Sequence, residues 1–546
     1  MDSKQQDSKT TIYSALSPFK NTMFRMLWIA TVCSNIGTAM HEVGAAWLMT
    51  SLAPTPIMIS LMVTATSLPI VLFTLPGGAI ADIFDRRLVL IITQGYMFAI
   101  AVSLGVLTIM GITNPSILLT LTFALGIGSS ISMPAAIPIP SSLVPRSEMP
   151  AALTLGAIGI NIGRAIGPTA GGFIVTAIAP WIVFFLNAAS LISLMVVLYR
   201  LQLKSPRYGS LPPERFIEAI RSQVRYVRYS NVVHIVIVRI CIFAICSSAL
   251  SALLPLIAKR QLHLDPTGFG FLLGSLGMGA VICGILILPK LRTKASVELL
   301  ISFGTGIFAV VMFLMAHTHH FILLCGIMGL GGIAWIMILS NLYVAGFKSA
   351  PKWVGGRVLA VYLLILNGGL AAGSLLWGIV AGKVGIPVAL SVASLALAVS
   401  LIISRSRYRT TVVDELDFTP SMHWIVPQTV MEPSDSRGRV LITIEYHINP
   451  ESAYDFDQAM CKLGQIRKRE GIIYWELFRD VTDAGRYIEV SIAESWKEHL
   501  RQHEHVTATD RAAEEKVRKL LKEGTQPIVS HFITEHIFKA ENIHQD

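Results

Sequence analysis

The sequence contains few charged residues. Of its 546 residues 14% are charged and 53% are hydrophobic, whereas soluble proteins carry roughly 25% charged residues. Acidic residues are scarcest in residues 1–434, which hold 14 Asp and Glu against 28 Lys and Arg, while residues 435–546 hold 20 and 16. The shortage of charge excludes an ordinary soluble protein. Because the basic excess belongs to the apolar part of the chain, we expect no nucleic-acid partner.

Cysteine is also scarce. Of the six cysteines, five lie in apolar stretches and Cys461 stands alone in the tail. No spacing among them indicates a disulfide framework or a metal site, which fits a reducing cytosolic face. Residues 1–19 are polar and lack the apolar core of a signal peptide. The sequence therefore predicts no metal and no cofactor.

Long apolar runs, in contrast, are abundant. A helix needs about 20 mostly apolar residues to cross a bilayer. Twelve runs meet this need: 24–50, 57–81, 88–110, 115–134, 152–176, 181–200, 232–257, 268–289, 297–316, 320–344, 357–382 and 386–404. They predict an all-α polytopic membrane protein with twelve transmembrane helices, which has the lipid bilayer as a partner.

The loops between these runs differ in their basic residues. Those near 51–56, 111–114 and 177–180 contain no Lys or Arg, whereas the alternate loops are crowded with them. By the positive-inside rule the crowded loops are cytoplasmic. We therefore expect a multi-pass protein of the cell membrane with both termini in the cytoplasm.

One glycine pattern occurs twice in the apolar part, 206 residues apart. The first copy and its counterparts are Asn161, Gly163, Gly167 and Gly172, and Asn367, Gly369, Gly373 and Gly378. An internal repeat of membrane helices is typical of secondary transporters. We therefore expect a cytoplasmic N-terminal segment (1–20), a six-helix half (21–200), a central loop with an amphipathic helix (201–231), a second six-helix half (232–404), a linker (405–438) and a cytoplasmic domain (439–546).

The hydrophobic period changes in the tail. Alternation predicts strands at 440–448, 472–481, 487–495 and 528–538. Helical spacing predicts helices at 450–469 and 496–521. The order β-α-β-β-α-β is typical of a ferredoxin-like α+β domain.

The fifth apolar run has small residues along one side. They are Gly163, Gly167, Gly171 and Gly172, with Pro168 among them. Small residues let helices approach closely in lipid, and proline permits a bend. A glycine run alone indicates a tight helix–helix seam. The longer pattern resembles the antiporter motif in the fifth span of the major facilitator superfamily.

The loop between the second and third runs carries a second pattern. Its residues are Gly78, Asp82, Arg86 and Arg87. They resemble the signature cytoplasmic loop of the superfamily, although Ile83 and Asp85 depart from the commonest form. The resemblance implies that Asp82 meets the start of the eleventh span, near residues 356–357, in one conformation and so biases alternating access. The alternative is an ordinary turn with solvated charges.

Further stretches, among them 143–146, 356–359 and 495–503, resemble the transmembrane secretion effector family, which includes the enterobactin exporter. The likeness covers most of the chain. It implies a secondary active transporter that exports a small-molecule substrate, such as a drug or siderophore, in exchange for protons. The tail is similar to dimeric α/β barrels that include cofactor-free monooxygenases, which leaves open a homodimer through this domain.

Ionisable residues in membrane spans are candidates for function, because burying them is costly. The first run holds Asn35, His41 and Glu42, and Thr31, Asn35, Thr38 and Glu42 share one helical face. Glu42 is the acidic residue that we place within the hydrophobic body of a run, where it could exchange a proton. The alternative is a wet polar face without a coupling role. The family usually has polar rather than acidic residues near this position.

Two arginines are candidate cations of the interior. Arg164 lies in the fifth run and Arg239 in the seventh. Arg164 could pair with Glu42 or attract an anionic substrate. Either side chain could instead extend toward the bilayer surface or support packing.

In the tail, His499 and His503 lie four residues apart on one helical face, a spacing that can ligate zinc. The His-Glu-x-x-His protease signature is absent, and we interpret this face as solvated. No nucleophile and base stand out as a pair. We favour an efflux transporter over two other hypotheses, which are a membrane-tethered enzyme with a monooxygenase-like tail and a non-transporting sensor on a transporter fold.

Overall fold

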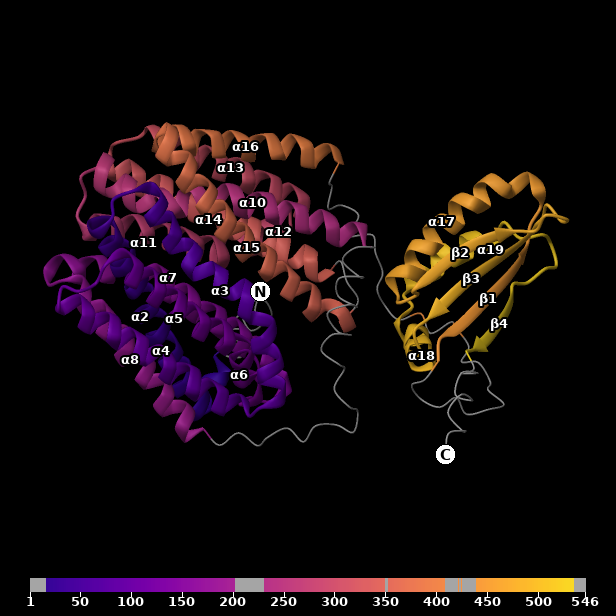
Figure 1. The fold of residues 1–546 in the computed structure, drawn as a ribbon, viewed down its shortest axis with the longest axis horizontal. Helices are drawn as coiled ribbons and strands as arrows, with labels where there is room; N and C mark the ends of the chain where they lie inside the picture. The colour runs from indigo at the N-terminus through magenta and orange to yellow at the C-terminus, as the bar shows by residue number, and fades with distance from the viewer. Residues whose placement is uncertain are drawn as a thin grey trace, which may run out of the picture. The chain divides into compact units, whose positions relative to one another are not determined.

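The computed structural model describes residues 16–201, 230–348, 352–407, 421, 424 and 438–534. The chain divides into two compact units (Figure 1): residues 1–211, 237–343 and 362–409 form the first, and residues 212–236, 344–361 and 410–546 the second. Most of the predicted N-terminal segment, central loop and linker lies outside the described residues. The amphipathic helix expected in the central loop lies there too.

Long helices make up the membrane part. Those of the N-terminal half are α2 (Thr22–Leu52), α3 (Pro56–Ile83), α4 (Arg86–Ile109), α5 (Pro115–Ala136), α7 (Met149–Ala177) and α8 (Pro180–Arg200). Those of the C-terminal half are α10 (Asn231–Leu256), α11 (Pro266–Ile282), α13 (Val297–His317), α14 (Phe321–Lys348), α15 (Lys352–Val384) and α16 (Ile386–Arg407). Shorter helical segments join them: η1 (Ser17–Lys20), α6 (Pro138–Ser142), η2 (Arg146–Glu148), η3 (Ile257–Gln261), η4 (Cys283–Ile287) and α12 (Leu288–Arg292).

Eleven of the described helices are long and apolar enough to cross a membrane. The twelfth, α2, has 31 residues and packs against α7 and α8, but its polar face makes it less apolar than the others. The predicted all-α membrane fold is confirmed, with eleven of the twelve expected spans apolar enough among the described residues. The eighth span is not the single continuous helix that we expected, because η4 widens it into π-helical turns before α12.

Short connections with capping residues explain where several helices begin. Thr55, Asn114 and Asp265 each precede a proline at the start of α3, α5 and α11, and each side chain accepts a backbone N–H bond of the first turn. Proline is favoured at this position because its missing N–H has no helical partner anyway. A capped helix end can therefore follow a loop of only a few residues.

The C-terminal domain contains β1 (Val440–His447), η6 (Pro450–Ser452), α17 (Ala453–Arg469), β2 (Tyr474–Arg479), β3 (Arg486–Ala493), α18 (Trp496–His505), α19 (Ala508–Arg518) and β4 (Ile528–Ile533). The sheet order is β2-β3-β1-β4, and each neighbouring pair is antiparallel. This is the predicted ferredoxin-like order. The sheet packs its inner face on helical side chains such as Phe456, Met460 and Leu463.

The helix predicted at 496–521 is wrong in its continuity. It consists of α18 and α19, which are separated at Val506 and Thr507. Thr507 caps α19: its side chain accepts from the Asp510 N–H, and the Asp510 carboxylate accepts from the Thr507 N–H. A Thr followed three residues later by Asp is the sequence signal for this new start. The final strand ends at Ile533, and the rest of its predicted range from residue 535 lies outside the described residues.

Candidate transport site

The glycine run of α7 forms a seam with α2. A Cβ added to Gly163 would lie 2.7 Å from the Asn35 Cβ, and one added to Gly167 would lie 2.5 Å from the Ala39 Cβ. At Gly171 an added Cβ would lie 2.8 Å from the Met40 Cα. The two backbones can approach this closely because glycine has no side chain. The seam therefore fixes α7 directly against the polar face of α2. Pro168 lies buried within α7.

The last glycine of the run faces a different helix. α7 also lies beside α11 of the other half (Figure 1). A Cβ on Gly172 would lie 2.3 Å from the Pro266 carbonyl oxygen, and Thr267 donates from its N–H to Thr176 Oγ1 at 3.1 Å. The repeat-related Gly378 of α15 is equally close to Ser60 of α3. The repeat thus gives two related contacts between the halves, one of α7 with α11 and one of α15 with α3.

Two other repeat-related glycines have open surroundings. A Cβ on Gly78, near the end of α3, would meet no atom within 4 Å. One on Gly284, in η4, would meet only an Ile336 methyl group at 4.0 Å. Gly172 and Gly378 are tightly packed, whereas Gly78 and Gly284 are not.

Glu42 lies next to this packed region. Its side chain is exposed, and it lies within electrostatic range of Arg164. Arg164 is also exposed, and its backbone oxygen would lie 2.2 Å from a Cβ on Gly277 of α11. The structure therefore places the two sequence-predicted charges on neighbouring helices, α2 and α7, within electrostatic range of each other.

Two polar side chains of α2 have buried nitrogen atoms without a hydrogen-bond partner among the described residues. These groups are Asn35 Nδ2 and both ring nitrogens of His41. The His41 ring packs on Phe184 of α8, with centroids 4.7 Å apart. Buried polar atoms in folded proteins are rarely left unpaired. The polar face of α2 thus carries unsatisfied hydrogen-bonding capacity beside Glu42.

Arg239 has a different setting from Arg164. Its guanidinium donates to both carboxylate oxygens of Glu298, at 2.8 and 2.6 Å, and Ser302 Oγ donates to the same carboxylate at 3.3 Å. The pair borders a cavity of about 30 Å³ between α10, α13, α14 and α16. Sequence analysis missed Glu298, which lies at the start of its span. The signal was an arginine in a neighbouring span that required an anionic partner.

The loop after α3 has a structural role that its motif did not reveal. Asp85, where the superfamily usually has glycine, caps α4 by accepting the Arg87 N–H at 2.8 Å. Arg87 donates from Nε to the Leu198 carbonyl at 2.8 Å, and it also binds the Tyr199 carbonyl. It therefore satisfies the end of α8. The Asp82 side chain lies outside the described structure, so its predicted contact stays a prediction.

We expected the tail histidines His499 and His503 to lie on a solvated face. The structure contradicts this prediction. His499 is 3% exposed. Burial, together with the neighbouring His503 and His531, lowers the pKa of His499 to about 3. Burial also lowers the pKa of His503 and that of His531. Near neutral pH these three imidazoles are uncharged.

Two six-helix halves, related by a repeat and joined by glycine seams, define a membrane transporter of the major facilitator type. The chain belongs to the transmembrane secretion effector family, whose sequence profile matches residues 13–538. The family predicted from the motifs is confirmed.

Individual relatives are more distant. The uncharacterized MFS-type transporter YfiS of Bacillus subtilis (strain 168) is 25% identical over 183 residues, which cover 33% of this chain and 43% of the relative. A bacterial homologue of the human lysosomal transporter Spinster, in an inward-facing and unoccupied conformation, has a TM-score of 0.58 at 15% identity, covering 73% of this chain and 98% of that one. The nucleoside transporter NupG has a TM-score of 0.56 at 12% identity, covering 71% of this chain and 100% of that one. At these identities the solved structures show the fold alone.

Proposed function

We propose that the protein exports a small amphipathic molecule, such as a drug or a siderophore, by alternating access in exchange for protons. The setting of Glu42 carries the proposal. This acidic side chain in a membrane helix lies within electrostatic range of Arg164 and is next in sequence to His41, whose imidazole has no partner among the described residues. A carboxylate that exchanges a cationic partner for a proton links proton binding to a rearrangement of the helices that carry both groups.

The surroundings of Glu42 support a position in the transport path. Its side chain is exposed, while its chain neighbours His41 and Val43 are buried. An exposed carboxylate on α2, which packs against α7 and α8, fits a residue that lines an opening in the helix bundle. Arg164 can attract the anionic groups of a substrate from the same place.

The contacts between the halves support alternating access. Lys259 donates to Ser51 at 2.9 Å, and Thr267 binds Thr176. Both contacts lie beside loops that have few basic residues. If the positive-inside rule holds, these loops are outside the cell, both termini are in the cytoplasm, and this conformation is closed to the outside. Gly78 and Gly284, which have open surroundings, would then lie toward the cytoplasm, where the opposite state closes.

The experiment that tests coupling is Glu42→Gln. A first screen in an efflux-deficient host, with siderophores, macrolides and dyes, identifies a substrate by its reduced accumulation. Purified protein in proteoliposomes is then assayed with and without an imposed pH gradient. We expect Glu42→Gln to insert normally but to lose the acceleration of transport by the gradient, because the amide cannot exchange a proton.

Glu148→Gln is the matched control, because Glu148 directly precedes α7 and is not part of the polar face of α2. It should retain the response to the gradient. An unchanged response in Glu42→Gln would remove Glu42 from the coupling mechanism. Absence of transport of every screened compound by the wild-type protein, in cells and in liposomes, would favour the sensor hypothesis.

The C-terminal domain is an accessory part in this proposal. Truncation after Arg409 should leave efflux measurable, whereas turnover of an aromatic substrate with oxygen would revive the enzyme hypothesis. We also propose that the domain pairs with a second copy through the outer face of its sheet. This face mixes charged residues such as Glu445, Glu476 and Arg486 with partly or fully exposed apolar side chains: Tyr474, Phe478, Ile488, Val490, Ile492, Ile528 and Phe532.

A further inference from the structure

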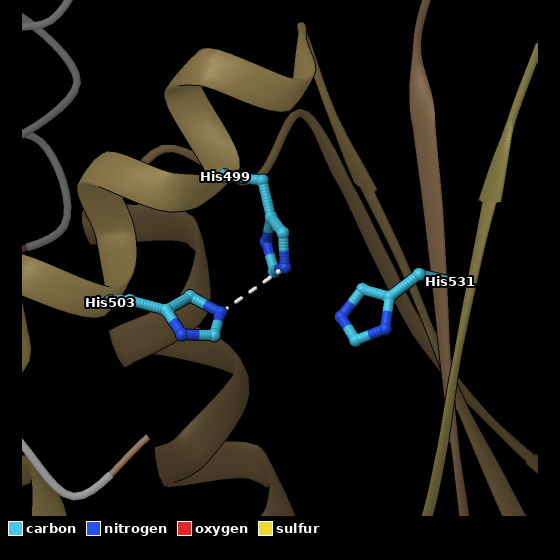
Figure 2. A group of neighbouring side chains, drawn as sticks. All are labelled: His499, His503 and His531. Atoms are coloured by element: carbon cyan, nitrogen blue, oxygen red, sulfur yellow. Dashed lines mark hydrogen bonds between the residues drawn. The ribbon is translucent and has the colours of Figure 1, made fainter. Parts of the chain in front are cut away.

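Three histidines of the C-terminal domain converge although they come from different elements. His499 and His503 lie on α18, one turn apart, and His531 lies on β4. Figure 2 shows their rings directed toward a common space between the helix and the strand. One nitrogen from each ring lies within 4.8 Å of the others. The sequence separated His531 from the helical pair, so helical spacing alone could not include it.

The distance between the helical pair fits joint ligation of one ion. His503 Nε2 and His499 Nε2 are 3.2 Å apart. Two nitrogens bound to one tetrahedral zinc at its usual bond length are roughly 3.3 Å apart. The nitrogens of the three rings lie up to 4.8 Å apart, so the side chains would have to close by up to about 1.5 Å to reach the spacing of zinc ligands.

Neighbouring groups hold the rings in this arrangement. His499 Nδ1 lies 3.4 Å from Gln502 Oε1, and Gln502 is buried. If Nδ1 carries the proton and donates it to this oxygen, the Nε2 lone pair is free to bind a metal. A metal-bound histidine usually donates the N–H of its other ring nitrogen to a neighbouring acceptor in this way. Trp496 packs against both His499 and His531. Trp424 lies beside His503, with ring centroids 5.0 Å apart.

The charges near the rings are compatible with a cation. Arg467 is the positive group that acts on His499 and His503. It forms ion pairs with Glu489 at 3.2 Å and Glu514 at 3.0 Å. Two carboxylates thus offset one guanidinium, and the local cluster does not repel a divalent ion.

We propose that His499, His503 and His531 form a binding site for a divalent transition-metal ion, with zinc as the best match. Three neutral imidazoles suit zinc, cobalt, nickel and copper rather than calcium or magnesium, which prefer oxygen. Three protein ligands leave the fourth position of a tetrahedral ion to water or another small ligand. This site is independent of the proposed transport function.

The test uses the full-length protein in detergent, purified through a tag without histidine and freed of metal with a chelator. Co²⁺ is then titrated and followed by its visible absorption, which is intense for four-coordinate ions, and Zn²⁺ is added in competition. We expect one Co²⁺ per chain, displaced by Zn²⁺. His503→Gln and His531→Gln should each weaken binding at least about tenfold, whereas the control His447→Gln, a histidine on β1 outside the cluster, should bind as the wild type does.

Two results would overturn the site: a titration of the wild type without a saturable step, or equal affinity in the wild type and both cluster variants. If both variants fail to fold, thermal unfolding of the wild-type protein decides. A ligand that binds the folded state raises the melting temperature, so we expect a rise that saturates at one equivalent of Zn²⁺. A melting temperature independent of Zn²⁺ would contradict the proposal.

Discussion

Charged residues of the membrane helices have two distinct settings at the scale of single residues. Arg239 is paired with Glu298 through two hydrogen bonds, while Arg164 and Glu42 are exposed. A buried pair with two good hydrogen bonds holds helices together, whereas exposed charges remain available to ligands and protons. The structure therefore favours Arg164 over Arg239 as a group that changes partners.

Arg239→Met should destabilise the protein strongly, because Glu298 would keep a buried charge without its partner. We expect a loss of about 3–5 kcal/mol in the free energy of unfolding. The double variant Arg239→Met with Glu298→Met should recover most of this loss, since both charges are removed. Thermal unfolding in detergent, together with the amount of folded protein, checks both. If the double variant folds well but does not transport, the pair has a role in the transport cycle instead.

At the scale of elements, the positions of glycines along α7 and α15 determine which helices pack closely against them. Gly163, Gly167 and Gly171 face α2, while Gly172, next in the chain, faces α11. The second copy behaves alike: an added Cβ on Gly369 would lie 2.6 Å from Ala244 of α10, the span equivalent to α2. Both copies are therefore seams, and the N-terminal copy differs chiefly by the nearby charges.

Gly167→Ala should weaken the seam between α7 and α2, because the new Cβ would lie 2.5 Å from the Ala39 Cβ. Overpacking of this kind typically costs about 1–3 kcal/mol. Gly156→Ala on the same helix is the matched control, since a Cβ there would meet no atom within 4 Å. Melting temperatures in one detergent compare the two. Equal stability of both variants would mean that α7 and α2 are not closely packed.

The sequence predicted elements better than their ends and breaks. The hydrophobic period was sufficient to predict α17 and the strands, because it arises when one face of an element is buried. The break between α18 and α19 was missed, since the apolar period continues across Thr507 and the capping box is a short signal. α2 was predicted correctly although its polar face makes it less apolar than the other membrane helices.

At the scale of the whole molecule, a 206-residue repeat organises the membrane part, and a sheet with exposed apolar side chains on its outer face follows it. If that face joins two chains, transporters would be held in pairs by the C-terminal domain. A charge at its centre should then separate the chains without affecting the fold of the membrane part.

Val490→Lys, on the central strand β3, should convert a dimer to a monomer, because a lysine buried in an interface loses its hydration. Light scattering coupled to size-exclusion chromatography in detergent measures the mass per particle. Tyr454→Lys is the control, since Tyr454 is 73% exposed on α17, on the helical side of the domain. A monomeric wild type, or a dimer that persists in Val490→Lys, would contradict pairing through this face.

The sequence by itself determined the membrane spans, the two related halves, the family and the strand order of the tail. These properties depend on local hydrophobic period and on motifs, which a chain carries in linear form. Only the tertiary structure decided which charges pair, which helix each glycine meets, and that His531 joins His499 and His503. The reason is physical: such contacts depend on distances between elements, and a side chain's partner is fixed by packing rather than by its place in the chain.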